Sequence, residues 1–189
     1  MSETRCCSAV LLTCLIASPA QADDYLWSGA GNGIGATVGT SQGGELYRVT
    51  FGRDWPEGKV WRWKSGWRGT PFWTVSVGNA EPDVSTDVTG EDLWHAGAGI
   101  NVRFSRPARQ QMRFFADAGV GLHWVSETEF DGLDIDTAYQ FSPNFAFGLQ
   151  GQRWEFGYQL WHLSNAGTGD SNPGINFHQL RIGYRFNID

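Results

Sequence analysis

Residues 154–176 read WEFGYQLWHLSNAGTGDSNPGIN, and the first half of this stretch alternates with a period of two. The even positions from Trp154 to Leu160 are apolar, whereas the odd positions are mostly polar or small. Such alternation is typical of a β-strand with one apolar face. His162 and Ser164 continue that face at the end of the strand. A base and a hydroxyl nucleophile on an apolar face indicate a substrate that arrives through hydrophobic surroundings.

Residues 1–22 are predicted to be a secretory signal peptide. Arg5 precedes a mostly apolar stretch from Cys6 to Ala17, and the small-residue pattern Ala20-Gln21-Ala22 predicts cleavage before Asp23. All three cysteines lie in this segment. Residues 23–189 are therefore predicted to form a single domain without a disulfide, a cysteine nucleophile or a thiolate metal site.

The composition of this domain favours strands over helices. It is rich in tryptophan and glycine and poor in lysine, which suits short alternating strands with aromatic girdles. Its apolar runs stay well below the roughly 18 residues that a membrane-spanning helix needs. The net charge of -6 argues against nucleic acid as a partner.

Period-two patterning recurs along the chain and predicts about eight strands. Beside the strand that starts at Trp154, the alternating segments are roughly 26–40, 46–55, 60–77, 93–104, 113–125, 137–149 and 177–186. The segment 60–77 is long for one strand, so a bulge or bend is expected near Gly69-Thr70-Pro71. The predicted fold is all-β.

Two barrel architectures accommodate these strands, and they differ in the direction of the apolar faces. In a soluble, lipocalin-like binder the apolar faces line an inner cavity. In a transmembrane barrel they face lipid, and a narrow interior holds the polar residues. The polar faces of this chain place charges close to glycines, which suits a cramped interior of paired side chains. We therefore expect an eight-stranded antiparallel transmembrane β-barrel, with His95 and His123 inside and His178 on the outer wall.

The lengths of the connections indicate the orientation of this barrel. Short links near 105–111 and 150–152 alternate with longer polar ones near 79–92, 127–136 and 165–175. Outer-membrane barrels have short periplasmic turns and longer outer loops. The strand that carries His162 and Ser164 runs into a long loop. We expect a multi-pass protein of the Gram-negative outer membrane, with both side chains facing the lipopolysaccharide leaflet.

Ser164 and His162 have the spacing of a nucleophile and its base. They lie two residues apart on one strand, so both project from the same face, and the imidazole can take the hydroxyl proton during attack on an acyl carbon. Such a base also needs a partner on its other ring nitrogen. If the long loop closes a hairpin, Asn176 comes near His162, and its side-chain carbonyl can accept the imidazole N–H.

The sequence His162–Gly167 (HLSNAG), the following Asn172–Asn176 (NPGIN) and the final Gly183–Phe186 (GYRF) resemble the PagL family of lipid A 3-O-deacylases. Upstream of His162 the resemblance rests on strand spacing. It implies an eight-stranded outer-membrane barrel, an ester hydrolase that removes the 3-hydroxyacyl chain at the 3-position of lipid A in lipopolysaccharide. It implies no cofactor and no metal. The partners would be lipopolysaccharide and membrane lipids, and a homodimer stays open beside a monomer.

The same resemblance implies roles for individual residues. Ser164 would be the nucleophile and His162 the base, with the backbone after Ser164 and Asn165 or Asn172 as candidate oxyanion donors. Asn176 stands where the family has a glutamate. An asparagine can orient an imidazole but cannot stabilise the imidazolium by charge. Activity could be lower, could depend on another carboxylate such as Asp170, or could be absent.

Two alternatives to an esterase therefore stay open. One is a non-enzymatic small outer-membrane barrel, structural or adhesin-like, with a degenerate active site. The other is the soluble lipocalin-like binder. The direction of the apolar faces distinguishes the lipocalin-like binder from the two membrane barrels, the esterase and the inert protein. These two membrane barrels differ only in whether they catalyse a reaction.

Overall fold

The computed structural model describes residues 32–41, 44–55, 60–82, 91–106 and 112–186. The predicted signal peptide and the start of the first expected strand, residues 26–31, lie outside these ranges. In the part of the chain that is described, no helix is long and apolar enough to cross a membrane.

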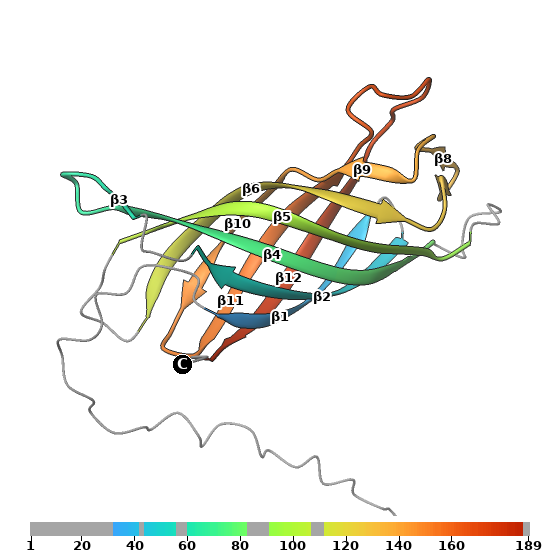
Figure 1. The fold of residues 1–189 in the computed structure, drawn as a ribbon. Helices are drawn as coiled ribbons and strands as arrows, with labels where there is room; N and C mark the ends of the chain where they lie inside the picture. The colour runs from blue at the N-terminus through green and yellow to red at the C-terminus, as the bar shows by residue number, and fades with distance from the viewer. Residues whose placement is uncertain (1–31, 42–43, 56–59, 83–90, 107–111, 187–189) are drawn as a thin grey trace, which may run out of the picture.

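Eight long antiparallel strands form the wall of a barrel (Figure 1). They are β1 (Gly33–Ser41), β2 (Gly44–Asp54), β4 (Arg68–Glu81), β5 (Leu93–Ser105), β6 (Arg113–Val125), β10 (Asn144–Gln150), β11 (Trp154–Leu163) and β12 (Ile175–Arg185). Each strand pairs with the next one in this order, and β12 pairs with β1, which closes the sheet. The prediction of an eight-stranded barrel is confirmed.

A short strand, β9 (Tyr139–Phe141), prolongs β10 towards the outer loops. The two pair with β6 in one continuous register and are separated only by Ser142 and Pro143. Proline has no N–H to donate, so the ladder is interrupted there without a change of direction. Phe141 of β9 forms a bridge with Ser164, beyond the end of β11. This extension therefore fixes the backbone of the candidate nucleophile.

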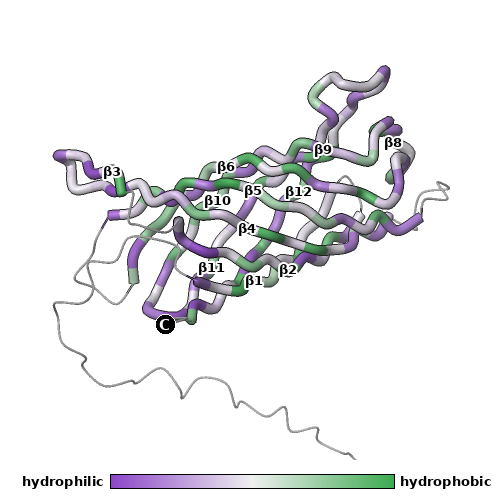
Figure 2. Tube along the Cα trace, in the orientation of Figure 1, coloured by the Kyte–Doolittle hydropathy of each residue, from purple (hydrophilic) through white to green (hydrophobic). Residues whose placement is uncertain are grey.

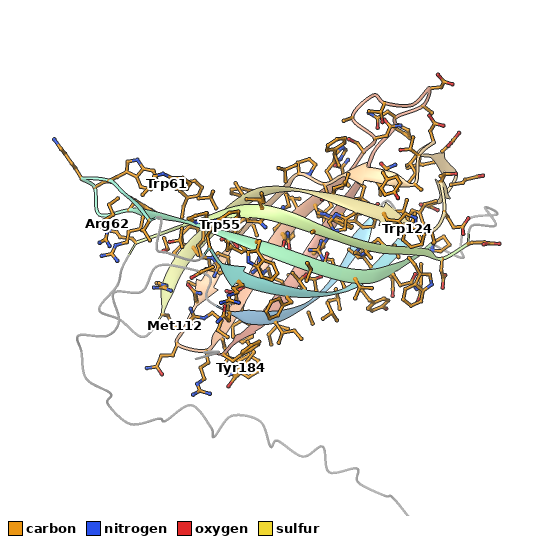
Figure 3. All side chains as sticks on the ribbon, viewed as in Figure 1. Trp55, Trp61, Arg62, Met112, Trp124 and Tyr184 are labelled. Atoms are coloured by element: carbon orange, nitrogen blue, oxygen red, sulfur yellow. The ribbon has the colours of Figure 1, made fainter. Side chains whose placement is uncertain are left out.

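The apolar faces of the strands point outward. Large apolar side chains are about half exposed along the wall, for example Ile100 at 55% and Leu180 at 66%, and green apolar stretches are spread over the strands of the barrel in Figure 2. Aromatic residues lie at both ends, with Trp55 and Trp124 near opposite ends in Figure 3. This exterior is that of a transmembrane barrel, and it excludes the lipocalin-like alternative, whose apolar faces would be inside.

The central interior holds a cluster of paired charges. Arg103 is fully buried and donates to Asp117 at 2.7 Å and to Glu155 at 2.6 Å. Arg181 contacts both carboxylates as well. Arg48 donates to two buried glutamines. Because an uncompensated buried charge is very costly, the two carboxylates are what allow Arg103 and Arg181 to lie in the interior.

The interior near the outer loops is apolar, which the strand patterns did not predict. Inward-facing Trp161 and Leu163 of β11 pack into a fully buried cluster. The other members are Leu46, Ala80, Leu93, Val125, Phe130, Ile135, Ile175 and Phe177. Phe130 and Ile135 come from the loop segment that contains β7 (Glu129–Phe130) and β8 (Leu133–Asp134). The outer loops thus close the barrel with a small hydrophobic core beside the candidate site.

The segment 60–77 differs from its prediction. Instead of one strand bent near Gly69, it forms a hairpin in which β3 (Trp61–Arg62) pairs with the start of β4. The turn lies at Lys64–Gly66, where Gly66 has a φ of 85°, and Trp63 N–H donates to the Trp67 carbonyl at 3.0 Å. A glycine accepts this left-handed φ without steric cost, so the turn forms there rather than at the proline.

Candidate active site

His162 is held at the outer end of β11 by its backbone and by its ring. The backbone N–H of His162 donates to the carbonyl of Pro143 at 3.1 Å. In the β11–β12 ladder, His162 lies opposite Asn176 of β12. The imidazole Nδ1 is 2.8 Å from Oδ1 of Asn176. The predicted pairing of these two side chains is therefore present on the lipid-facing side of the wall.

The contact with Asn176 defines which ring nitrogen is the base. An amide oxygen can only accept, so Nδ1 carries the proton in this pair and Nε2 keeps its lone pair. A neutral imidazole of this tautomer can take a proton at Nε2. Such a pair can serve as the base and the orienting partner of a hydrolytic triad.

Ser164 follows His162 by two residues and lies on the same outward face. Its backbone exchanges two hydrogen bonds with Phe141, of 3.0 and 2.7 Å. The hydroxyl oxygen accepts a long bond of 3.4 Å from the Ala166 N–H. Among the described residues, no hydrogen bond joins the Ser164 hydroxyl to His162. Catalytic hydrogen bonds are often loose without substrate and tighten in the reactive complex.

A tight turn directly follows Ser164 and brings the backbone N–H of Ala166 towards the Ser164 hydroxyl. It runs from Asn165 to Thr168, whose N–H donates to the Asn165 carbonyl at 3.1 Å. The two central residues, Ala166 and Gly167, have φ values of 54° and 78°. Both positive values define a type I′ turn. Alanine is strained in this region, and strain of this kind is typical of functional loops.

Asn165 is completely buried and connects this turn to its surroundings. Its side-chain N–H groups donate to the carbonyls of Ser171, at 2.6 Å, and Ile135, at 3.3 Å. Its side-chain oxygen accepts the N–H of Gly167 at 2.9 Å. With these bonds the Asn165 side chain holds the loop rather than facing the substrate side.

Asn172 is exposed and lies against the same turn. Its Oδ1 accepts the backbone N–H of Asn165 at 3.2 Å. The hydrogen bonds of the described residues leave its Nδ2 without an acceptor in the protein. Of the two asparagines predicted as oxyanion donors, Asn172 is thus the one with a donor to offer.

Gly174 packs directly against the base, a contact that the sequence did not reveal. A Cβ built on this residue would lie 2.5 Å from Cε1 and 3.0 Å from Nε2 of His162. Its φ of 64° is also left-handed. The absence of a side chain here leaves room for the edge of the imidazole that carries Nε2. The Asn-Pro-Gly sequence signalled a turn, but not this contact.

The outer wall around the pair is apolar. Phe145 of β10 lies opposite Leu160, and both are exposed, at 46% and 40%. Asp170, considered as a substitute carboxylate, has its backbone N–H bound to Asp136 and makes no ion pair with His162 among the described residues. The surroundings of the pair are therefore those of lipid rather than of an aqueous cleft.

The other histidines lie where the alternation predicts. His95 and His123 are buried in the interior, and His123 contacts the hydroxyls of Ser76 and Ser142 at 3.0 and 2.8 Å. His178 is on the outer wall, where its Nδ1 contacts the hydroxyl of Tyr158. The fold and site together define a transmembrane barrel of the outer-membrane type, with a serine and a histidine on its lipid-facing wall.

Comparison with known proteins identifies the family. A family model described as Lipid A 3-O-deacylase (PagL) matches residues 45–185. The chain belongs to this family, as the motif at His162 predicted.

Two relatives show how far the similarity extends. Lipid A deacylase PagL of Bordetella bronchiseptica (strain ATCC BAA-588 / NCTC 13252 / RB50) is 36% identical over 75 residues, 39% of this chain and 42% of that protein. The match therefore spans less than half the length of that relative. A solved structure, the crystal structure of the outer membrane enzyme PagL, has a TM-score of 0.72 at 22% identity and covers 82% of this chain and 99% of the other. It shares the barrel fold.

Proposed function

We propose that the protein is an outer-membrane serine esterase that hydrolyses the ester-linked 3-hydroxyacyl chain at the 3-position of lipid A. The observation that carries the proposal is the position of the pair. His162, oriented by Asn176 at 2.8 Å, and Ser164 lie on the lipid-facing wall beside the long loops. The acyl esters of lipid A lie between the sugar and the acyl chains, at the boundary that a site near the outer end of the wall would meet.

The reaction follows the acyl-transfer scheme of serine hydrolases. The Ser164 oxygen attacks the ester carbonyl carbon while Nε2 of His162 takes the hydroxyl proton. The tetrahedral intermediate then expels the sugar oxygen, which receives that proton from the imidazolium. A water molecule, deprotonated by the same nitrogen, attacks the acyl-enzyme, and the Ser164 oxygen leaves with the proton. The products are a free 3-hydroxy fatty acid and lipid A with a free 3-hydroxyl.

The negative charge of the intermediate needs donors near Ser164. The Nδ2 amide of Asn172 is our candidate, because its oxygen is already bound to the loop at 3.2 Å and fixes the direction of its N–H groups. The Ala166 N–H, only weakly bound to the Ser164 hydroxyl at 3.4 Å, is a second donor within reach. Asn165 acts as a positioning residue that holds both in place.

The surroundings of Ser164 fit a long acyl chain. Phe145 and Leu160 continue from the pair towards the middle of the membrane on the exposed wall. A chain attached to a sugar at the level of Ser164 would lie along these residues and remain in lipid. All named groups belong to one chain, so the scheme is compatible with a monomer or a homodimer, and it requires neither cofactor nor metal.

A second candidate, an inert barrel with a degenerate site, is favoured by one observation. The partner of His162 is neutral Asn176 instead of a carboxylate, so the imidazolium formed during attack gains no charge stabilisation. The two functions are separated by chemistry alone, because their barrels would be the same.

The purified, refolded protein in detergent micelles with lipid A tests the proposal. Mass spectrometry of the extracted fatty acids should show a free 3-hydroxy fatty acid that accumulates with time. Ser164→Ala, checked for an intact barrel by its heat-modifiable gel mobility, should release none. Equal release by both proteins, or no release by either, would overturn the esterase assignment, and absence of release by both would favour the inert barrel.

A further inference from the structure

The hairpin of residues 60–68, here called the tryptophan hairpin, projects from the end of the barrel opposite the candidate site. β2 ends at Asp54 and β4 begins at Arg68, at the end where the short turn from Gln150 to Trp154 also lies. In Figure 1 the label β3 is at the far end from β8 and β9. Short turns mark the periplasmic side of outer-membrane barrels, so the hairpin faces the periplasmic leaflet.

The two faces of this hairpin differ in chemistry. Trp61 pairs with Gly69, and the Trp63 N–H donates to the Trp67 carbonyl. Cross-strand partners project to the same side, so the three indoles share one face with Gly69. Arg62 pairs with Arg68 on the opposite face. The hairpin is therefore amphipathic, with aromatic rings on one side and guanidinium groups on the other.

Its aromatic face continues the lipid-facing wall. The ring of Trp63 lies 6.0 Å from that of Phe104 on β5, and a Cβ on Gly69 would be 2.9 Å from the Trp63 ring and 3.1 Å from the Trp61 ring. Trp61 nevertheless remains 51% exposed. Indole rings prefer the boundary between headgroups and acyl chains, so this face fits the membrane interface.

Positive charge gathers on the rest of the hairpin. Residues 60–68 include Arg62, Lys64 and Arg68 and no acidic residue. Arg106 adds a fourth cation, because a Cβ on Gly66 would lie 3.4 Å from its Nε. Arg62 and Lys64 are exposed, and cations of this kind form charge-assisted hydrogen bonds with anionic oxygens.

We propose that the tryptophan hairpin binds the phosphate headgroups of anionic phospholipids in the periplasmic leaflet and anchors the barrel at that interface. The indoles lie at the boundary of the acyl region, and the cations contact phosphate. Because the barrel is rigid, an anchor at this end fixes the depth of Ser164 at the other end. A lipid surface rather than a protein partner is indicated by the continuity of the indole face with the lipid-facing wall.

A fluorescent label on the turn tests this anchor. Residues 23–189 contain no cysteine, so Ser65→Cys in the full barrel provides a single labelling site for an environment-sensitive dye. The labelled protein is inserted into vesicles of phosphatidylcholine alone or mixed with phosphatidylglycerol, and emission is measured with and without a headgroup-located quencher. We expect a blue shift and stronger quenching with phosphatidylglycerol.

Matched variants distinguish headgroup binding from general insertion. Arg62→Gln with Lys64→Gln should abolish the difference between the two vesicle types, whereas Arg153→Gln, at another periplasmic turn, should preserve it. Trp61→Ser should reduce quenching in both vesicle types, and Trp94→Ser, at the opposite end, should not. Emission typical of a dye in water in both vesicle types would overturn the proposal. So would a blue shift with phosphatidylglycerol that persists in the Arg62/Lys64 variant. Emission that depends on protein concentration would overturn it in favour of contact between copies.

Discussion

Nδ1 of His162 lies 2.8 Å from Oδ1 of Asn176, so the candidate base is held by an amide at the place where a hydrolytic triad uses a carboxylate. A carboxylate can only accept a hydrogen bond, which fixes the useful imidazole tautomer, and its charge stabilises the imidazolium. The amide fixes the tautomer only when its oxygen faces the ring, and it has no charge with which to stabilise the imidazolium. The barrel therefore orients the imidazole as a triad would, without the negative charge of a carboxylate beside it.

Replacing Asn176 by a carboxylate should increase the rate of deacylation. Asn176→Asp keeps the size and position of the side chain and adds only charge, so we expect kcat to rise by about tenfold, which corresponds to about 1.4 kcal/mol of transition-state stabilisation. Asn176→Glu should act in the same direction, and Asn176→Leu should lower kcat below that of the native chain. Fatty acid release from lipid A by the purified proteins measures this. Identical rates for all four proteins would show that another group orients His162.

Gly174→Ala should lower kcat by displacing the imidazole. The new methyl group would lie 2.5 Å from Cε1 of His162, so the ring must shift from its present position. We expect a loss of at least about 10²-fold, the scale of a displaced catalytic group. Gly167→Ala is the matched control: its φ of 78° is also left-handed, but no atom lies within 4 Å of the added methyl. Comparable losses in both variants would point to backbone strain instead of contact with the base.

Asn165→Ala should loosen the loop that follows Ser164. The substitution leaves the carbonyls of Ser171 and Ile135 without their buried donor, at a cost of about 1–3 kcal/mol. Hydrogen exchange of amides in residues 165–172 should accelerate, and kcat should fall while the barrel remains folded. Thr168→Ala, which also removes a side-chain bond of the turn, provides a milder comparison. Unchanged exchange in Asn165→Ala would contradict the positioning role.

Glu155→Gln should destabilise the barrel without altering the chemistry of the site. Glu155 balances Arg103 and Arg181 in the buried interior, and removal of one partner of such a cluster costs about 3–5 kcal/mol. Urea unfolding in micelles, followed by tryptophan fluorescence, measures this cost. Glu45→Gln, on the exposed wall, should change stability by no more than about 0.5 kcal/mol. Equal stability of the two variants would show that the interior charges contribute little.

Strand patterning predicted the barrel because every strand alternates along its length. From Leu93 to Ser105, for example, the expected outward and inward sides match the exposed and buried residues of β5. The pairing of His162 with Asn176 also followed from parity, since one hairpin register brings the two outward residues together. Both predictions depend only on the two-residue period of a strand and on the closing of one loop.

The features that the sequence did not predict depend mainly on contacts between segments that are distant along the chain. Trp161 and Leu163 occupy the polar face of β11 by parity, but the loop that carries Phe130 and Ile135 folds over them and makes that end of the interior apolar. Gly174 gave only a turn signal, because its role depends on the position of the His162 ring. The hairpin at Trp61 was read as a continuous strand, since its alternation persists through the turn.

Mass spectrometry of lipid A from a Gram-negative host that produces the protein tests the central claim most directly. The account predicts that lipid A loses one 3-hydroxyacyl chain, that fragmentation places the loss at the 3-position, and that the loss disappears with Ser164→Ala at equal levels of folded barrel. Lipid A that is identical in the two strains and in an empty-vector control, or a loss that persists in Ser164→Ala, would contradict it.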